Sequence, residues 1–167
     1  GSYATDVTGV GSKASASTRE IPQTVTVITR KRMDDQNLTS IEDAMRETTG
    51  MTVLSVDPAR FDLYSRGHRV DSIQVDGVSA NLNNFFVTPD LAVYDRIEVM
   101  KGPNALFSGS GNPGATVNLA RKRALDIWQV QGNGAVGSRN YRRGEFDVTG
   151  PLHPSKRIRA RVVGAYE

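Results

Sequence analysis

The sequence predicts an α+β fold, in which a small mixed four-stranded sheet with short helices is followed by longer antiparallel strands. Three observations predict it. Short apolar–polar alternations recur between glycines, one segment carries a helix start signal with a helical apolar period, and the strand-like segments lengthen after Arg123. The chain has 167 residues, 38% hydrophobic and with 16 glycines, which suits one domain with a core and many turns.

The first elements follow a segment without apolar periodicity. Residues 1–20 are rich in Thr, Ser, Ala and Gly, and we expect them to be extended and flexible. Over residues 21–29 valines alternate with threonines, which predicts a half-buried strand. A short helix is predicted over residues 30–36.

A second helix begins at a predicted capping box, with Thr39 as N-cap and Glu42 reaching back to it. It is predicted to stop at Gly50, which suits the left-handed position after a helix. The remaining elements are short segments separated by turn residues. They are strands at 51–56, 63–67, 72–78, 96–100 and 115–121, a helical turn at 91–95 and a short helix at 104–107.

After Arg123 the composition predicts three longer strands, at residues 128–136, 145–148 and 157–166. In the third strand the apolar residues share one face and the arginines share the other: Ile158, Ala160, Val162 and Gly164 against Arg157, Arg159 and Arg161. This pattern is typical of a transmembrane barrel strand, but a soluble sheet with one wet face has it too. Three strands cannot close a barrel, since the smallest known have about 8.

Composition excludes several classes of function. The 21 basic residues are spread among 18 acidic ones, so the net charge of +3 does not indicate a nucleic-acid surface. The absence of cysteine excludes disulfides and thiolate chemistry. No apolar run approaches the roughly 20 residues of a membrane-spanning helix, and the first residues do not resemble a signal peptide.

No catalytic constellation is indicated, and we expect no enzyme activity. The two histidines, His68 and His153, are far apart and lack acidic or thiol companions at metal-ligand spacing. The glycine-rich loop over 109–114 lacks the Gly-Lys-Ser/Thr ending of a phosphate-binding loop. Ser65 is near His68 in sequence, but nothing else indicates a nucleophile–base pair.

Three motif groups, in a fixed order, carry a resemblance to a known family. They are Arg19–Thr29 with Thr49–Met51, then Tyr64–Gly67 with Gln74–Val78, then Tyr94–Pro103 continuing through Leu106–Leu119. In order and spacing they closely resemble the plug domain of TonB-dependent receptors, specifically those for ferric siderophores. Residues 146–152 resemble the opening of the barrel in these receptors, so the resemblance covers nearly the whole chain from about residue 19 onward.

The resemblance implies a plug inside an outer-membrane barrel of about 22 strands in a Gram-negative bacterium. It implies a flexible segment over 1–20, the plug over 21–123, and truncated first barrel strands over 124–167. The plug would gate the barrel lumen, and the periplasmic protein TonB would rearrange it by pulling on an upstream segment. No convincing match to that segment precedes Ile21, so we expect it to be absent here.

Two basic residues, Arg66 and Lys101, match family positions that face acidic residues on the inner barrel wall. Desolvating a lone cation costs several kcal/mol, so each would need a carboxylate there. The alternative is that both are ordinary surface charges, satisfied by Asp71, Glu98 or water.

The family's ligand-binding loops correspond here to residues 56–61 and 81–86. A siderophore already wraps its iron, so the protein needs no metal ligand or cofactor of its own, only aromatic faces and hydrogen-bonding or cationic groups. The candidate ligand-binding residues are Arg60, Asn83, Asn84, Phe85 and Phe86. Either phenylalanine could instead fold into the core.

A different class of function is also consistent with the strand pattern. The chain could be a stand-alone soluble β-rich adaptor that binds a protein partner by strand addition. The adaptor predicts soluble, capped sheet edges, whereas the apolar face over 158–164 favours contact with lipid.

Overall fold

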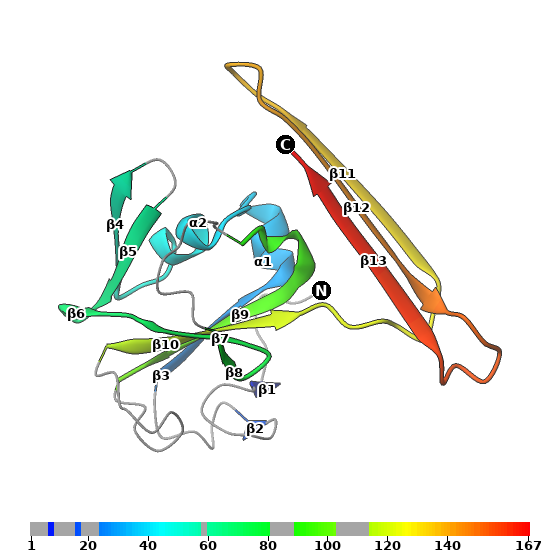
Figure 1. Cartoon of the computed structure of the whole chain (residues 1–167), viewed down its shortest axis with the longest axis horizontal. Coiled ribbons are helices and arrows are strands. Elements are labelled where there is room, and N and C mark those ends of the chain that lie inside the picture. The colour runs from blue at the N-terminus through cyan, green and yellow to red at the C-terminus, as the bar shows by residue number, and fades with distance from the viewer. Residues whose placement is uncertain (1–6, 9–15, 18–23, 58–59, 81–88, 103–113) are drawn as a thin grey trace. The chain divides into compact units, whose positions relative to one another are not determined.

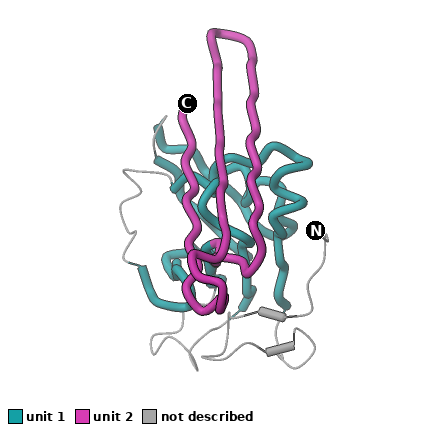
Figure 2. Tube along the Cα trace, turned by 90° about the vertical axis from the view of Figure 1, so that its right-hand side faces the viewer, with its two compact units in different colours: residues 1–121 teal, residues 122–167 magenta. Residues whose placement is uncertain are grey.

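The structure is a computed structural model, and it describes residues 7–8, 16–17, 24–57, 60–80, 89–102 and 114–167. The chain forms two compact units, unit 1 over residues 1–121 and unit 2 over residues 122–167 (Figure 2). None of the helices in the described ranges is long and apolar enough to cross a bilayer.

Unit 1 is built on a mixed five-stranded sheet (Figure 1). Its strands, in hydrogen-bonded order, are β3 (Thr24–Thr29), β9 (Tyr94–Lys101), β10 (Ala115–Arg121), β7 (Ser72–Val75) and β8 (Val78–Ala80). β10 pairs parallel with β7 and antiparallel with β9, so the last strand of the unit is central. The sheet has one strand more than predicted, because Asp76 and Gly77 turn the chain back within the predicted 72–78 strand.

Two smaller sheets complete unit 1. β4 (Met51–Asp57) and β5 (Arg60–Ser65) form an antiparallel hairpin, to which β6 (His68–Arg69) adds a short third strand. β1 (Val7–Thr8) and β2 (Ala16–Ser17) form a two-residue antiparallel ladder. The predicted helix at 104–107 and the start of the first predicted strand, 21–23, lie outside the described residues.

Two helices match predicted positions, α1 (Arg30–Asp35) and α2 (Ile41–Arg46). The capping box of α2 was predicted one residue too early. Ser40 is the N-cap instead of Thr39: its hydroxyl accepts the N–H of Asp43 at 3.1 Å, and the Asp43 carboxylate accepts the Ser40 N–H at 3.2 Å. The pairs Thr39–Glu42 and Ser40–Asp43 both have the spacing of a capping box. In the structure Ser40 has the extended backbone of an N-cap and forms both hydrogen bonds with Asp43.

The end of α2 also differs from the prediction. The helix ends at Arg46, and Gly50 lies beyond it with a φ of +78°, next to the first residue of β4. The left-handed conformation of Gly50 therefore serves the entry into β4 and not the end of the helix. A third helical element, η1 (Leu91–Val93), is a single 3-10 turn capped by the Asp90 side chain.

The core of unit 1 joins one face of the large sheet to the helices and to the β4–β5 hairpin. The two central strands contribute residues two apart, as the alternation of side chains requires: Ile97 and Val99 from β9, and Ala115, Val117 and Leu119 from β10. The fully buried large side chains of this cluster are Ile28, Met33, Ile41, Met45, Leu63, Leu91, Ile97, Val99 and Leu119. Burial of an aliphatic side chain contributes about 1.5–3 kcal/mol to stability, so this cluster is the main stabilising feature of unit 1.

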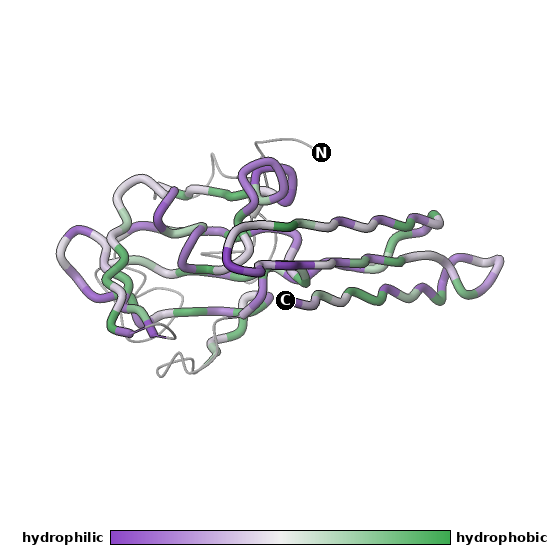
Figure 3. The backbone as a smooth tube through the Cα atoms, turned by 90° about the horizontal axis from the view of Figure 1, so that it is seen from above, coloured by the Kyte–Doolittle hydropathy of each residue, from purple (hydrophilic) through white to green (hydrophobic). Residues whose placement is uncertain are grey.

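Unit 2 is an antiparallel three-stranded sheet of β11 (Gln129–Val136), β12 (Arg142–Pro151) and β13 (Arg159–Tyr166). Figure 3 shows hydrophobic and hydrophilic residues alternating along these strands. The large exposed hydrophobic residues of the sheet and its edges include Trp128, Val130, Val136, Phe146, Ile158, Val162 and Tyr166. The polar residues alternate with them, as the predicted face pattern of the third strand requires.

Candidate functional site

Arg66 lies in a tight turn that its local sequence dictates. Arg66 and Gly67 join β5 to β6 as a two-residue loop, with φ angles of +52° and +81°. Two successive positive φ angles are typical of a type I′ hairpin turn, whose twist matches that of the flanking strands and which favours Gly at the second position. The turn holds the exposed Arg66 side chain at one end of the small sheet.

Lys101, the last residue of β9, lies over the connection between α2 and β4. Its ammonium group donates a hydrogen bond to the Thr49 carbonyl. Its side chain passes beside Gly50, where an added Cβ would lie 3.7 to 3.9 Å from it. Burial, and second the positive charge of Arg66, lower the pKa of Lys101 from its ordinary value of 10.5. Arg66 therefore lies near enough to Lys101 for their charges to repel.

Neither of these cations has a carboxylate partner within the part of the chain that the structure describes. Glu98, the nearest acidic candidate in sequence to Lys101, instead pairs with Arg96 at 2.8 Å. The two neighbouring cations, one of them partly buried, repel each other, and no carboxylate among the described residues compensates their charge. Chemically, the pair Arg66–Lys101 is suited to hold one or two carboxylates supplied from elsewhere.

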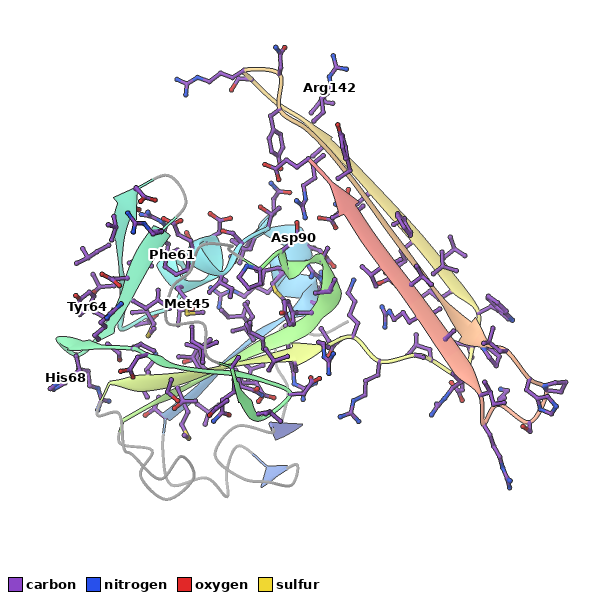
Figure 4. The ribbon with its side chains drawn as sticks, viewed as in Figure 1. Met45, Phe61, Tyr64, His68, Asp90 and Arg142 are labelled. Atoms are coloured by element: carbon purple, nitrogen blue, oxygen red, sulfur yellow. The ribbon has the colours of Figure 1, made fainter. Side chains whose placement is uncertain are left out.

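Arg60 begins β5 at the end of the β4–β5 hairpin where the two strands are joined through residues 58–59. Its Nε lies 2.5 Å from Oδ2 of Asp57, and both side chains are partly exposed. On the same hairpin Leu54 and Val56 are 52% and 59% exposed. Phe61, by contrast, is buried and directed toward the α2 side of the hairpin (Figure 4). The hairpin end therefore combines a cation with exposed aliphatic surface.

The other predicted ligand residues, Asn83, Asn84, Phe85 and Phe86, lie outside the described residues. Their position relative to Arg60 stays a prediction. The strand pattern did not single out Leu54 and Val56, because period-two alternation does not say which face the helices cover.

A polar network fixes the β4–β5 hairpin to α2. Glu42 accepts hydrogen bonds from Arg46 at 2.6 Å and from the Ser55 hydroxyl at 2.9 Å, and Arg46 also donates to Ser55 at 2.8 Å. The hydrogen bond from Arg46 holds the pKa of Glu42 below its usual value of 4.5, so Glu42 is ionised at neutral pH. The network positions the strand that leads to Arg60.

A second network neutralises a carboxylate inside the large sheet. Glu98 is completely buried and accepts hydrogen bonds from Arg96 at 2.8 Å and from the Asn118 amide at 2.9 Å. The Asn118 carbonyl in turn accepts the Gly77 N–H at 2.9 Å, which connects β9 and β10 to the β7–β8 turn. These groups satisfy one another, so we assign them a structural role.

The described residues contain no group of three or more potential metal-ligating side chains. His153 forms hydrogen bonds with Ser155 in a loop of unit 2, and His68 is exposed at the edge of unit 1 (Figure 4). The Ser65 hydroxyl is buried and has no hydrogen-bond partner among the described residues. It therefore forms no nucleophile–base pair with His68.

A family model decides the identity of this arrangement. The model of the TonB-dependent receptor plug domain matches residues 17–116, which is more than half of the chain. The chain belongs to the TonB-dependent receptor plug family. The match covers most of unit 1, with its small mixed sheet and short helices.

Several relatives of this plug are similar over nearly all of its length. It is 41% identical over 170 residues to the ferric-pyoverdine 358 receptor of Pseudomonas putida, covering 99% of this chain and 21% of the relative. The crystal structure of the ferripyoverdine receptor of the outer membrane of Pseudomonas aeruginosa, bound to ferripyoverdine, matches with a TM-score of 0.91 at 38% identity, covering 98% of this chain and 22% of that one.

The structure of the alcaligin outer-membrane receptor FauA of Bordetella pertussis is also similar, with a TM-score of 0.86 and 36% identity, covering 98% of this chain and 29% of that one. The predicted fold class, plug followed by the start of the barrel, is confirmed by these structural matches. The chain spans about a fifth of the length of the curated relatives that it matches.

Proposed function

We propose that this chain is the plug, with the first barrel strands, of an outer-membrane receptor that imports a ferric siderophore. The plug gates the barrel lumen, and TonB supplies the energy by pulling on a segment upstream. The observation that carries the proposal is the 41% identity, over 99% of this chain, to a receptor for a ferric siderophore. The proposal makes the chain part of a transporter and not of an enzyme.

Within this function, Arg66 and Lys101 bind carboxylates of the inner barrel wall and hold the plug in the closed state. Their proximity and the absence of an acidic partner among the described residues support the assignment. A carboxylate beside them relieves the repulsion between the two cations and raises the pKa of Lys101. The sequence predicts the plug over residues 21–123 and the barrel strands from residue 124, with residues 1–20 before the plug. The compact units divide two residues earlier, between Arg121 and Lys122, and we take that point as the boundary between plug and barrel.

Ligand recognition falls to the outward loops of the plug. Arg60 supplies a cation for the oxygen atoms of the chelate, and Asn83, Asn84, Phe85 and Phe86 supply amides and aromatic faces. The exposed aliphatic side chains of Leu54 and Val56 add apolar contact for the organic shell. Iron stays in the siderophore as part of the transported ligand.

Unit 2 fits the wall of the barrel. Its exposed apolar residues suit the hydrocarbon of the outer membrane, and its polar face, which carries Asp147 and Arg161, suits the interior. The alternative of a soluble adaptor is disfavoured because a water-exposed sheet face of this kind would aggregate.

The proposal is tested by quenching of intrinsic fluorescence in the full-length receptor with a panel of ferric siderophores, combined with uptake of radioactive iron by intact cells. At least one ferric siderophore should quench and be imported. Quenching by haem, cobalamin or a sugar alone would overturn the substrate class while leaving the fold unchanged.

Variants at the hairpin sharpen this test. Arg60→Ala should weaken binding of the imported siderophore by about tenfold, the effect of losing one charge-assisted hydrogen bond. Arg69→Ala is the matched control, because Arg69 forms an exposed ion pair with Asp62 on β5 away from the hairpin end. Equal affinities of the two variants would remove Arg60 from the ligand site.

A further inference from the structure

Two consecutive residues, Arg121 and Lys122, are bonded to aspartates of different units. The Arg121 N–H donates to Oδ1 of Asp76 at 2.9 Å and its Nε donates to Oδ2 at 2.6 Å, all within unit 1. The Lys122 ammonium lies 2.7 Å from Oδ2 of Asp147, within unit 2. The boundary between the units is therefore the single peptide bond that joins these two residues.

The two attachments differ in their exposure to solvent. The side chains of Arg121 and Asp76 are 64% and 31% exposed, whereas those of Lys122 and Asp147 are only 10% and 8% exposed. Water and salt screen an exposed ion pair much more than a buried one. Asp147 also accepts two hydrogen bonds from Arg161, at 2.8 and 2.6 Å, so it holds two cations at once.

The backbone that follows Lys122 is also hydrogen-bonded to unit 2. Arg161 donates to the Arg123 carbonyl at 2.8 Å, and the Leu125 N–H donates to the Thr149 hydroxyl at 2.9 Å. The Thr149 hydroxyl in turn donates a hydrogen bond to the Ala160 carbonyl at 3.1 Å, which links the contact to β13. Residues 122–125 are thus held to the strands β12 and β13 by side-chain and backbone hydrogen bonds.

We propose that residues 122–125 are a fixed anchor on the barrel wall, with Asp147 as its positioning residue, and that the plug pivots at the Arg121–Lys122 peptide bond when it rearranges. On this proposal the exposed Asp76–Arg121 clamp opens during the movement and the buried Asp147 cluster stays closed. The inference rests on the proposed function only in that the rearrangement is the one that accompanies transport.

Hydrogen exchange of the full-length receptor in lipid tests the anchor without any transport. Asp147→Asn keeps the shape and removes the charge, and it should accelerate exchange of the Leu125 amide and its neighbours by about tenfold, while the Arg121 amide is unchanged. Asp76→Asn is the matched variant and should accelerate only the Arg121 amide. Thr149→Val, which removes the acceptor of the Leu125 amide directly, gives a second route if Asp147→Asn does not fold.

The same measurement on receptor energised by ferric siderophore and TonB tests the pivot. Exchange should rise within residues 24–121 and stay slow within 122–125. A rise in 122–125 together with the plug, or unchanged Leu125 exchange in both Asp147→Asn and Thr149→Val, would overturn the proposal. If ferric siderophore and TonB raise exchange nowhere, the proposed function fails, whereas the unenergised comparison of variants still decides the anchor.

Discussion

The ring of Phe146 on β12 lies over Gly164 on β13, at paired positions of the ladder. A Cβ at Gly164 would come within 2.3 Å of that ring, and Trp128 lies over Gly150 in the same way, at 2.4 Å. Each ring occupies the space that a side chain on the neighbouring strand would need. Gly150 and Gly164 are therefore packing positions for aromatic side chains as well as strand residues.

Gly164→Ala should destabilise the full-length receptor by about 1 kcal/mol or more, because the Phe146 ring must leave its rotamer. The midpoint of denaturant unfolding measures the change. Gly134→Ala is the control, since a Cβ there meets nothing within 4 Å, and its effect should stay below about 0.5 kcal/mol. Equal losses in the two variants would argue against the packing role.

Two neighbouring residues at the start of α2, Thr39 and Ser40, should respond differently to substitution by alanine, because only Ser40 is the N-cap. Ser40→Ala should cost about 1 kcal/mol of unfolding free energy, because it removes the acceptor for the Asp43 N–H. Thr39→Ala should be nearly neutral, since only the backbone carbonyl of Thr39 is used, by the Leu91 N–H. Urea unfolding of both variants measures the difference, and a larger loss for Thr39→Ala would restore the cap predicted from sequence.

The buried carboxylate of Glu98 makes Arg96 indispensable. Arg96→Met should destabilise the plug by about 3–5 kcal/mol, because it breaks the ion pair between Arg96 and the fully buried Glu98 side chain. Arg69→Met removes an exposed ion pair with Asp62 and should cost at most about 1 kcal/mol. Chemical unfolding distinguishes the two, and a mild effect of Arg96→Met would show that Arg96 is not essential for burying the Glu98 side chain.

Lys101 gives unit 1 a pH dependence of known sign. Its folded pKa is lowered, so between that pKa and the ordinary value of 10.5 the folded chain binds fewer protons than the unfolded one. The penalty for burying the cation is therefore fully present below the folded pKa, and stability rises as pH increases through the folded pKa toward 10.5.

Arg66→Gln removes the repelling charge and should raise the pKa of Lys101, measured by NMR titration of the lysine ε-carbon in the isolated chain. Arg69→Gln, which leaves Arg66 in place, should not change it. An unchanged Lys101 pKa in Arg66→Gln would show that the two cations do not interact, and would weaken their proposed shared role at the barrel wall.

Local patterns predicted most of the elements, because they depend on residues close in sequence. The alternation of valine and threonine over β3 was evident, whereas the turn at Asp76–Gly77 was missed inside the strand predicted over 72–78. The cap of α2 was assigned to the wrong residue because Thr39 and Ser40 both satisfy the local spacing. Only the conformation of the folded backbone distinguishes them.

The parts that sequence could not predict depend on contacts between distant residues. Lys122 and Asp147 are 25 residues apart, and neither residue type signals the other. The burial of Glu98 depends on Asn118 from a different strand. Arg66 and Lys101 were identified from the family resemblance, whereas their mutual repulsion follows from the structure alone.

The central position of β10 has a consequence for biosynthesis. In the large sheet β3 pairs only with β9, and β7 joins the rest of the sheet only through β10. While a ribosome has delivered the chain only as far as β8, the nascent polypeptide holds isolated hairpins and no common sheet. Closure waits for Ala115–Arg121. Because β10 completes the sheet so late, unit 1 cannot bury its core until nearly all of its residues have been synthesised.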